Sequence, residues 1–257
     1  QGERIFGRQG LLAGLRNFFR QKHSAKPLEA LLKEVFGDLT LGELGRNLLI
    51  PFYSMHPGEP RAVFAHGGPA YSPDAGGRDY GPLLLREVVR ASTAAPTYFN
   101  PAAVRENGAS ERVAYLGIDG GLFANNPALC AYVEARKLFP GEEIVVVSMG
   151  CGKAKTTYPR GIRNWGLFDW IAPAHGVPLL KAVMHGQTDS VDHQMRVLLG
   201  PAGGDAFYRF EFPLDDVGKG LDDASAANID RLITAADRAM AEAAATVADF
   251  VARRAAP

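Results

Sequence analysis

Cysteine is scarce in this sequence: the 257 residues contain only Cys130 and Cys151. Neither belongs to a C-x-x-C pair or stands near histidines at metal-binding spacing, so the pattern indicates no disulfide framework and no cysteine-based metal site. Apolar runs are short, and none reaches the roughly 18 residues that a membrane-spanning helix needs. The first residues lack the charged-then-apolar order of a secretory signal. These absences predict a soluble protein of a reducing compartment, and therefore a cytoplasmic one.

Net charge is also missing, because 28 Lys and Arg residues balance 28 Asp and Glu residues. Without a positive field or a basic patch, we expect no nucleic acid polymer as a partner. The length and the 47% hydrophobic content suit one core, so we expect a single domain over residues 1–257. The first residue is Gln1 rather than Met, and a helical pattern follows directly. This start predicts that the chain has been cut at its beginning. The cut could come from processing or from a boundary that was chosen for the sequence, or the upstream segment could be separate.

Near the start, apolar residues at helical spacing predict an amphipathic basic helix over residues 10–20. Leu11, Leu15, Phe18 and Phe19 lie on its apolar face. An apolar face flanked by Arg and Lys suits a membrane surface, so these four side chains are candidates for peripheral contact with lipid. Ordinary packing against a core is the alternative interpretation.

Hydrophobic periodicity and breaker residues predict alternating helices and strands along the remaining chain. Helices are expected over residues 27–36, 83–95, 127–139, 178–199 and 226–253, and strands over 48–55, 61–66, 113–118, 143–149 and 207–212. Asn126 is expected as the N-cap of the helix that begins at Pro127. The run over 143–149 is β-branched without alternation, which is typical of a strand covered on both faces in a parallel sheet. Strand, helix and strand between residues 113 and 149 predict a βαβ unit within one α/β domain.

Asp119 follows the predicted strand 113–118 directly, and Gly120 and Gly121 follow Asp119. Ligands of open α/β sheets bind beyond the carboxyl ends of the strands, where this carboxylate is expected. It could take a proton from a hydroxyl nucleophile, orient a histidine or bind a metal, and the spacing does not separate these roles. Asp-Gly is also a common turn dipeptide, so a purely structural turn is the alternative.

Three motifs in order carry a resemblance to a known family: RASTAAPTYF over residues 90–99, IDGG over 118–121 and NNP over 125–127. With them the chain resembles the patatin-like lipid acyl hydrolases. The resemblance implies a three-layer α/β/α sandwich with a mainly parallel central sheet. It also implies a serine–aspartate dyad that hydrolyses fatty-acyl esters of lipids without metal or organic cofactor, with Asp119 as the dyad aspartate and Gly120 and Gly121 forming its turn.

The family's glycine-rich oxyanion loop and its G-x-S-x-G nucleophile turn are both missing before Asp119. Ser92 matches a family position that is not the nucleophile, and Ser148 lies within a strand pattern that favours packing. We therefore expect a C-terminal portion of the sandwich that lacks its N-terminal strands, with an upstream segment of the same protein carrying the serine. The alternative is a catalytically silent, patatin-shaped binding or regulatory module.

The resemblance also suggests that a small molecule regulates the protein. Some patatin-like phospholipases of bacterial anti-phage signalling resemble this architecture and respond to cyclic nucleotides. A small-molecule activator is therefore a third expectation, beside the lipid acyl-ester substrate and peripheral membrane contact.

An aromatic cluster, Trp165, Phe168 and Trp170, stands between the predicted strand 143–149 and the predicted helix 178–199. Core packing is the favoured interpretation. A groove for an acyl chain, or an anchor at a lipid interface, is the alternative, since indoles favour such boundaries.

Four potential ligands or relay residues, His185, Asp189, Asp192 and His193, lie close together in the sequence. Their spacing matches no recognised ligand set, so they are interpreted as the polar side of a partly exposed helix rather than as a metal site.

Overall fold

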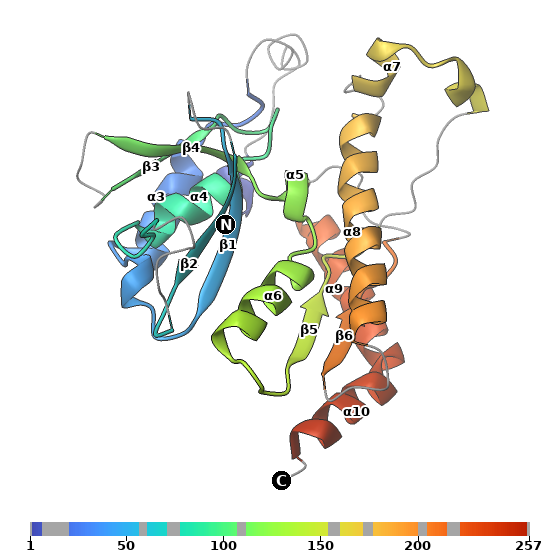
Figure 1. Ribbon diagram of the computed structural model, residues 1–257. Coiled ribbons are helices and arrows are strands. Elements are labelled where there is room, and N and C mark those ends of the chain that lie inside the picture. Colours follow the sequence, from blue (N-terminus) through green and yellow to red (C-terminus); the bar gives the residue numbers. More distant parts are fainter. Residues whose placement is uncertain are drawn as a thin grey trace. The chain divides into compact units, whose positions relative to one another are not determined.

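The computed structural model describes residues 2–6, 21–56, 61–70, 78–106, 112–153, 160–171, 177–199, 205–214 and 222–255. The chain divides into two compact units, Gln1–Asn125 and Asn126–Pro257, which are described separately (Figure 1). Both units combine helices with strands, which gives the mixed α/β character that the sequence predicts. Within the described ranges, no helix is long and apolar enough to cross a membrane. The single domain over residues 1–257 stays a prediction.

The first unit is built on a four-stranded sheet with the strand order β2-β1-β4-β3. Its strands are β1 (Leu48–Ser54), β2 (Arg61–Gly67), β3 (Ala102–Arg105) and β4 (Val113–Asp119). Every pairing in this sheet is antiparallel. The sheet thus differs from the predicted mainly parallel one. The reason lies in its residues, because buried and more exposed positions alternate along β2 and the middle of β4, as expected for antiparallel strands with one covered face.

The helices described in the first unit are short. They are α1 (Gly2–Ile5), α3 (Lys26–Phe36), the 3₁₀ turn η1 (Leu41–Glu43), α4 (Leu85–Ser92) and α5 (Gly121–Ala124). Helix α4 packs on β1, β3 and β4, and its Val88 and Ala91 are fully buried in one core with Phe52 and Val104. Gly117 on β4 permits this close packing, since a Cβ atom there would overlap the side chain of Ala91. The sheet face under α4 is therefore the core of this unit.

Helix α4 ends earlier than the sequence predicts, at Ser92 rather than near residue 95. The chain then turns through residues 93–99, where Thr97 adopts a left-handed backbone conformation with φ 74°. Pro96 contributes to this ending, because proline disfavours helical geometry in the preceding residue. The turn places the backbone carbonyl groups of Ser92 and Ala94 beside the end of β4.

The second unit contains a parallel pair of strands, β5 (Val145–Met149) and β6 (Ala206–Phe210). Its helical elements are α6 (Ala128–Leu138), η2 (Arg160–Asn164), α7 (Leu167–Ile171), α8 (Pro178–Leu198), α9 (Ala226–Glu242) and α10 (Ala244–Ala255). Helices α6 and α8 contact each other, and Ala128, Met195 and Leu199 form the centre of a small core. The parallel pairing agrees with the prediction from residues 143–149. The predicted covering of both faces is wrong for this strand, because Val147 is 41% exposed and Met149 is 77% exposed.

Two predicted elements are arranged differently from the expectation. The proposed βαβ unit joins strands of different sheets, because β4 pairs with β1 and β3 whereas β5 pairs with β6. The terminal helix expected over residues 226–253 is divided into α9 and α10 at Ala243. Local patterns locate these elements, but they do not specify partners that are distant in the sequence.

Candidate functional site

Asp119 is the last residue of β4, where the sequence places it. Its position in the sheet is set by pairing with Phe52 of β1. The backbone N–H of Asp119 donates to the carbonyl oxygen of Ala94 at 3.1 Å, and the N–H of Gly120 donates to that of Ser92 at 3.4 Å. The strand end is therefore held by β1 on one side and by the segment after α4 on another. Two motifs that are separate in the sequence, residues 90–99 and 118–121, meet here.

Gly120 is required by space rather than by backbone conformation, since its φ is an ordinary −67°. A Cβ atom at this position would overlap the carbonyl oxygen and carbon of Pro51. Close approach of two backbones is one of the standard reasons for glycine. The turn after Asp119 can therefore lie directly against β1 only when residue 120 has no side chain.

The Asp119 carboxylate is held at one oxygen. Its Oδ1 accepts a hydrogen bond from the backbone N–H of Gly121 at 2.7 Å, whereas Oδ2 has no hydrogen-bond partner among the described residues. The side chain is partly buried, and this burial raises the pKa of the Asp119 carboxyl above its ordinary value, with the Gly121 hydrogen bond opposing the rise. A carboxylate with one fixed oxygen and a raised pKa can act as a proton acceptor.

The same geometry also serves the turn. An aspartate that accepts from the N–H two residues later forms an Asx turn, and here it precedes the short helix α5. The geometry of Asp119 is thus compatible both with a purely structural turn and with a catalytic role. Of the two carboxylate oxygens, the turn engages only Oδ1.

Ser92, the last residue of α4, stabilises this turn through hydrogen bonds. Its Oγ donates to the carbonyl oxygen of Pro51 at 2.7 Å, while its own carbonyl oxygen accepts from Gly120. The hydroxyl thus bonds the same backbone carbonyl that excludes a side chain at position 120. Sequence reasoning did not assign this bracing role, although the 90–99 motif contains Ser92.

Ser148 lies buried on β5 in the second unit. Its Oγ donates to Oδ1 of Asn126 at 3.2 Å and lies 2.8 Å from Nη1 of Arg209, which donates to it. Arg209 in turn pairs with Glu211. Such a network suits packing within the sheet, the role that the sequence pattern favours for Ser148.

Asn126 was expected to cap the helix that follows it. Helix α6 begins two residues later, and the Oδ1 atom of Asn126 accepts the N–H of its first residue, Ala128, at 3.2 Å. The Nδ2 atom is buried and has no hydrogen-bond partner within the described part of the chain. The motif therefore starts α6 through an Asx-type bond, one position away from a standard N-cap.

The candidate lipid-facing residues Leu11, Leu15, Phe18 and Phe19 lie outside the residues that the structure describes. Their role stays a prediction. The polar cluster on α8 is described, and its acids are engaged: Asp189 pairs with Lys153 at 2.7 Å and Asp192 with Arg196 at 2.9 Å. No group of three or more His, Cys, Asp or Glu residues arranged to hold a metal occurs in the described segments.

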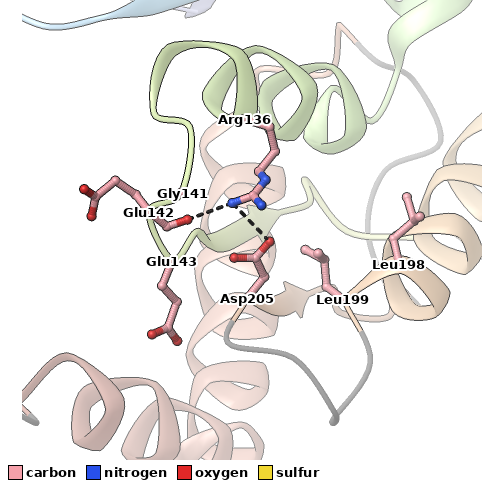
Figure 2. A pocket seen from close by; sticks show the side chains of 7 residues that line it. All are labelled: Arg136, Gly141, Glu142, Glu143, Leu198, Leu199 and Asp205. Carbon is pink, nitrogen blue, oxygen red and sulfur yellow. Dashed lines mark hydrogen bonds and ion pairs between the residues drawn. The ribbon is translucent and has the colours of Figure 1, made fainter.

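A pocket in the second unit has none of the predicted site residues in its lining (Figure 2). Its volume is about 320 Å³, and its lining consists of Arg136, Gly141, Glu142, Glu143, Leu198, Leu199 and Asp205. The Arg136 guanidinium spans it, donating to the Glu142 carbonyl oxygen at 2.7 Å and lying 3.8 Å from Asp205. Asp205 also accepts from Tyr132 and from the N–H of Ile144, a bond that lowers the pKa of its carboxyl. Arg136 and Asp205 are thus engaged with each other and with neighbouring groups of the protein.

Comparisons with known proteins place the chain in a family. Residues 3–132 match the family model of the patatin-like phospholipases. Patatin-like protein 2 of Oryza sativa subsp. indica is 27% identical over 235 residues, which cover 82% of this chain and 56% of that protein. A cGAMP-activated phospholipase of Pseudomonas aeruginosa is 29% identical over 212 residues, covering 78% of this chain and 56% of that protein. Patatin-like protein 2 of Arabidopsis thaliana is 26% identical over 207 residues, covering 73% and 48%.

The chain spans about half the length of these curated relatives. The matched region of the family model includes β4, Asp119 and the residues that hold it, from Pro51 on β1 to the 90–99 motif. With half of its residues matched by one family model, the chain belongs to the patatin-like phospholipase family.

Proposed function

We propose that the protein is a lipid acyl hydrolase, a phospholipase A or esterase, in which Asp119 is the proton acceptor of a serine–aspartate dyad. The observation that carries the proposal is the carboxylate at the end of β4, with Oδ1 fixed by Gly121 and Oδ2 unengaged within the described residues. The nucleophilic serine belongs to a segment of the whole protein outside these 257 residues. Membership in the patatin-like family supports both assignments.

In this mechanism the serine hydroxyl attacks the acyl carbonyl carbon while Asp119 accepts its proton. The negative charge on the carbonyl oxygen is stabilised by backbone N–H groups of a glycine-rich loop, also outside this chain. Collapse of the tetrahedral intermediate releases the alcohol with the proton from Asp119, and water then hydrolyses the acyl-enzyme by the reverse use of the same carboxylate. Partial burial of Asp119 supports this role, because a raised pKa makes a carboxylate a better proton acceptor.

No metal or organic cofactor takes part in these steps. The dyad needs only one carboxylate, one hydroxyl and backbone donors, and the geometry around Asp119 supplies the first of these. We further propose that the whole protein forms the three-layer sandwich of the family as a single domain, with a mainly parallel central sheet completed by strands outside this chain.

The kinetic test uses the complete protein and Asp119→Asn, which preserves the shape and the acceptor for the Gly121 N–H. We expect kcat/KM for a short-chain ester to fall about 100-fold or more, the usual loss when general base catalysis is removed. Asp189→Asn is the matched control, because this exposed carboxylate on α8 pairs with Lys153 and has no role in the proposal. Near wild-type turnover in Asp119→Asn would contradict the dyad assignment.

A catalytically silent, patatin-shaped binding or regulatory module is the second candidate. It is favoured by one specific observation, the absence of any G-x-S-x-G turn in these residues, while Ser92 and Ser148 are engaged in structural hydrogen bonds. The candidates differ in whether the complete protein carries a serine that reacts with a fluorophosphonate, a reagent class that labels activated serines.

We also propose that a small molecule activates the protein. One relative is named a cGAMP-activated phospholipase, which supports a small-molecule activator for this protein too. Measuring ester hydrolysis by the complete protein with and without cyclic dinucleotides tests this, and an unchanged rate would count against it.

We propose a cytoplasmic protein with peripheral access to membranes, because the substrate is the acyl ester of a membrane lipid.

A further inference from the structure

The buried guanidinium of Arg90 closes the loop that follows α4. Arg90 lies in the last turn of that helix, and its side chain is 4% exposed. Its Nη2 donates to the carbonyl oxygen of Asn100 at 3.1 Å and to Oδ1 of the same residue at 3.3 Å. The guanidinium also lies over the ring of Phe99, with its carbon 5.3 Å from the ring centroid. Arg90 thus joins the end of α4 to residues 99–100, and residues 93–98 form a loop between them.

This loop supports the strand end that carries Asp119. The Ala94 carbonyl oxygen accepts the backbone N–H of Asp119 at 3.1 Å. On the far side of the loop, the carbonyl oxygens of Thr97 and Tyr98 accept the N–H groups of residues 22 and 23, each at 2.9 Å. The position of the Asp119 backbone therefore depends on the shape of the loop, and closure at the base of the loop fixes that shape.

The closed loop is unfavourable for the fold in two respects. Thr97 is β-branched, yet its φ of 74° lies in the left-handed region that such residues rarely adopt. Burial lowers the pKa of the Arg90 guanidinium, and Glu29, 3.4 Å from Nε, opposes this change. The Nε and Nη1 atoms of Arg90 are buried without a hydrogen-bond partner among the residues that the structure describes, which is costly for a charged group. Backbone strain of this kind clusters at functional sites, which points to a role for the loop beyond stability.

We propose that Arg90 is a positioning residue for Asp119: by closing the loop over residues 93–98, it holds the Ala94 carbonyl oxygen where that oxygen fixes the end of β4. The Asp119 carboxylate then meets the serine hydroxyl in the geometry that proton transfer needs. Arg90 acts only through Asp119 and takes no part in the proton transfer itself. Displacement of a reacting group by about 1 Å can slow a reaction about 100-fold. The kinetic part of the inference rests on the proposed function, whereas the placement of the Asp119 backbone is measured without catalysis.

The kinetic experiment compares Arg90→Met with the parent in the complete protein. Methionine fills the buried space without unpaired donors, and the partners Asn100 and Glu29 are exposed to water, so the melting temperature should stay close to that of the parent. We expect kcat for a short-chain ester to fall about tenfold or more and KM to change less than about twofold, because a displaced proton acceptor slows the chemical step rather than binding. Arg196→Met is the matched control, an ion-paired arginine over an aromatic ring on α8, and its kcat should match the parent. Unchanged kcat in Arg90→Met would overturn the proposal.

Asp119→Asn separates positioning from a merely structural role. In a variant that carries both Arg90→Met and Asp119→Asn, we expect kcat to equal that of Asp119→Asn alone, because the carboxylate through which Arg90 acts is already gone. A general structural defect would lower kcat by the same factor in both backgrounds, and this additive loss would overturn the proposal. If Arg90→Met does not fold, Arg90→Lys repeats the cycle with the charge kept. It should also lower kcat, because an ammonium group lacks the planar donor set that spans Asn100 and Phe99.

Amide hydrogen exchange tests the positioning without any ester hydrolysis. The backbone N–H of Asp119 should exchange about tenfold faster in Arg90→Met than in the parent, because the Ala94 carbonyl oxygen is held less firmly. Amides of β2, which pairs with β1, should be unchanged. Equal exchange at Asp119 in variant and parent, or an equal rise throughout β2, would overturn the proposal. If Asp119→Asn keeps the turnover of the parent, or the parent has no esterase activity, the proposed function fails, while faster exchange confined to the strand end still supports Arg90 as the residue that positions Asp119.

Discussion

At the scale of single residues, Asp119 and Gly120 at the end of β4 are constrained by different physical effects. Asp119 is constrained electrostatically, since burial raises the pKa of its carboxyl while the Gly121 N–H opposes the rise. Gly120 is constrained by shape, because Pro51 of β1 occupies the space that a side chain would need. Both properties follow from contacts across the sheet rather than from the Asp-Gly-Gly sequence, so each can be tested by its own substitution.

The pH dependence of stability follows from Asp119. A folded-state pKa raised above the ordinary value of 3.8 means that the folded protein binds this proton more tightly than the unfolded chain does. The contribution of this group to the free energy of unfolding is therefore lost as pH rises through the interval between the two pKa values. Asp119→Asn removes the cost of burying an ionised carboxylate, so at neutral pH the variant should melt at the same or a higher temperature than the parent.

Thermal melts of parent and Asp119→Asn at several pH values check this sign. The difference in melting temperature should narrow as pH falls toward the ordinary aspartate pKa. A variant that is less stable than the parent at neutral pH, with the difference vanishing in acid, would indicate a carboxyl whose pKa is lowered in the fold. In the complete protein, the acidic limb of the kcat/KM profile should likewise lie above the ordinary aspartate value.

Gly120→Ala tests the space beside β1. The added methyl group would overlap the backbone of Pro51, so we expect the free energy of unfolding to fall by about 1–3 kcal/mol. Chemical denaturation measures the effect. Gly45→Ala is the control, because no atom beyond its two chain neighbours lies within 4 Å of the corresponding Cβ position, and its stability should stay close to that of the parent. Equal stability of both variants would mean that the strand end is not in close contact with β1.

At the scale of elements, the turn after α4 connects the helix to the candidate site. The carbonyl groups of Ser92 and Ala94 accept the N–H groups of Gly120 and Asp119, and the Ser92 hydroxyl bonds Pro51. Helix α4 also fills the covered face of the sheet with Val88 and Ala91. One element thus packs the core and positions the strand end, which gives a physical reason for the 90–99 and 118–121 motifs to occur together.

Ser92→Ala tests the brace. Loss of the Ser92 hydroxyl leaves the Pro51 carbonyl without this donor, and we expect a cost of about 0.5–1.5 kcal/mol in the free energy of unfolding. Thr93→Ala is the neighbouring control, since its hydroxyl bonds Val89 within the exposed side of the same helix. If both variants lose the same stability, the Ser92 bond has no special role. In the complete protein Ser92→Ala should still be labelled by a fluorophosphonate, because Ser92 is not the proposed nucleophile.

At the scale of the whole molecule, we propose that Asp119 is the aspartate of a dyad whose serine lies elsewhere in the protein. We predict that a fluorophosphonate labels the complete protein on a peptide outside these 257 residues. Asp119→Asn should lower the labelling rate, because the serine then lacks its proton acceptor. Peptide mapping by mass spectrometry measures both. Label on Ser148 or Ser92 would contradict the assignment, and no label at all would favour the silent module.

Sequence patterns located most elements of the chain to within a few residues. The strands at 61–67 and 113–119 and the helix at 178–198 were predicted closely, because alternation and helical spacing are local properties. The position of Asp119 at a strand end was predicted for the same reason. Its catalytic role stays a prediction, since the dyad came from family resemblance, and the residues expected to face lipid near the start lie outside the described part of the chain.

By itself the sequence determined which segments become helix or strand, the abrupt turn at Asp119, and membership in a family recognisable from three short motifs. Only the tertiary structure decided the antiparallel order β2-β1-β4-β3, the contact of Gly120 with Pro51, and the exposure of Phe168 beside two packed indoles. The physical reason is distance along the chain. Periodicity reports which face of an element is apolar, but strand partners and solvent exposure depend on segments far apart in the sequence that meet only on folding.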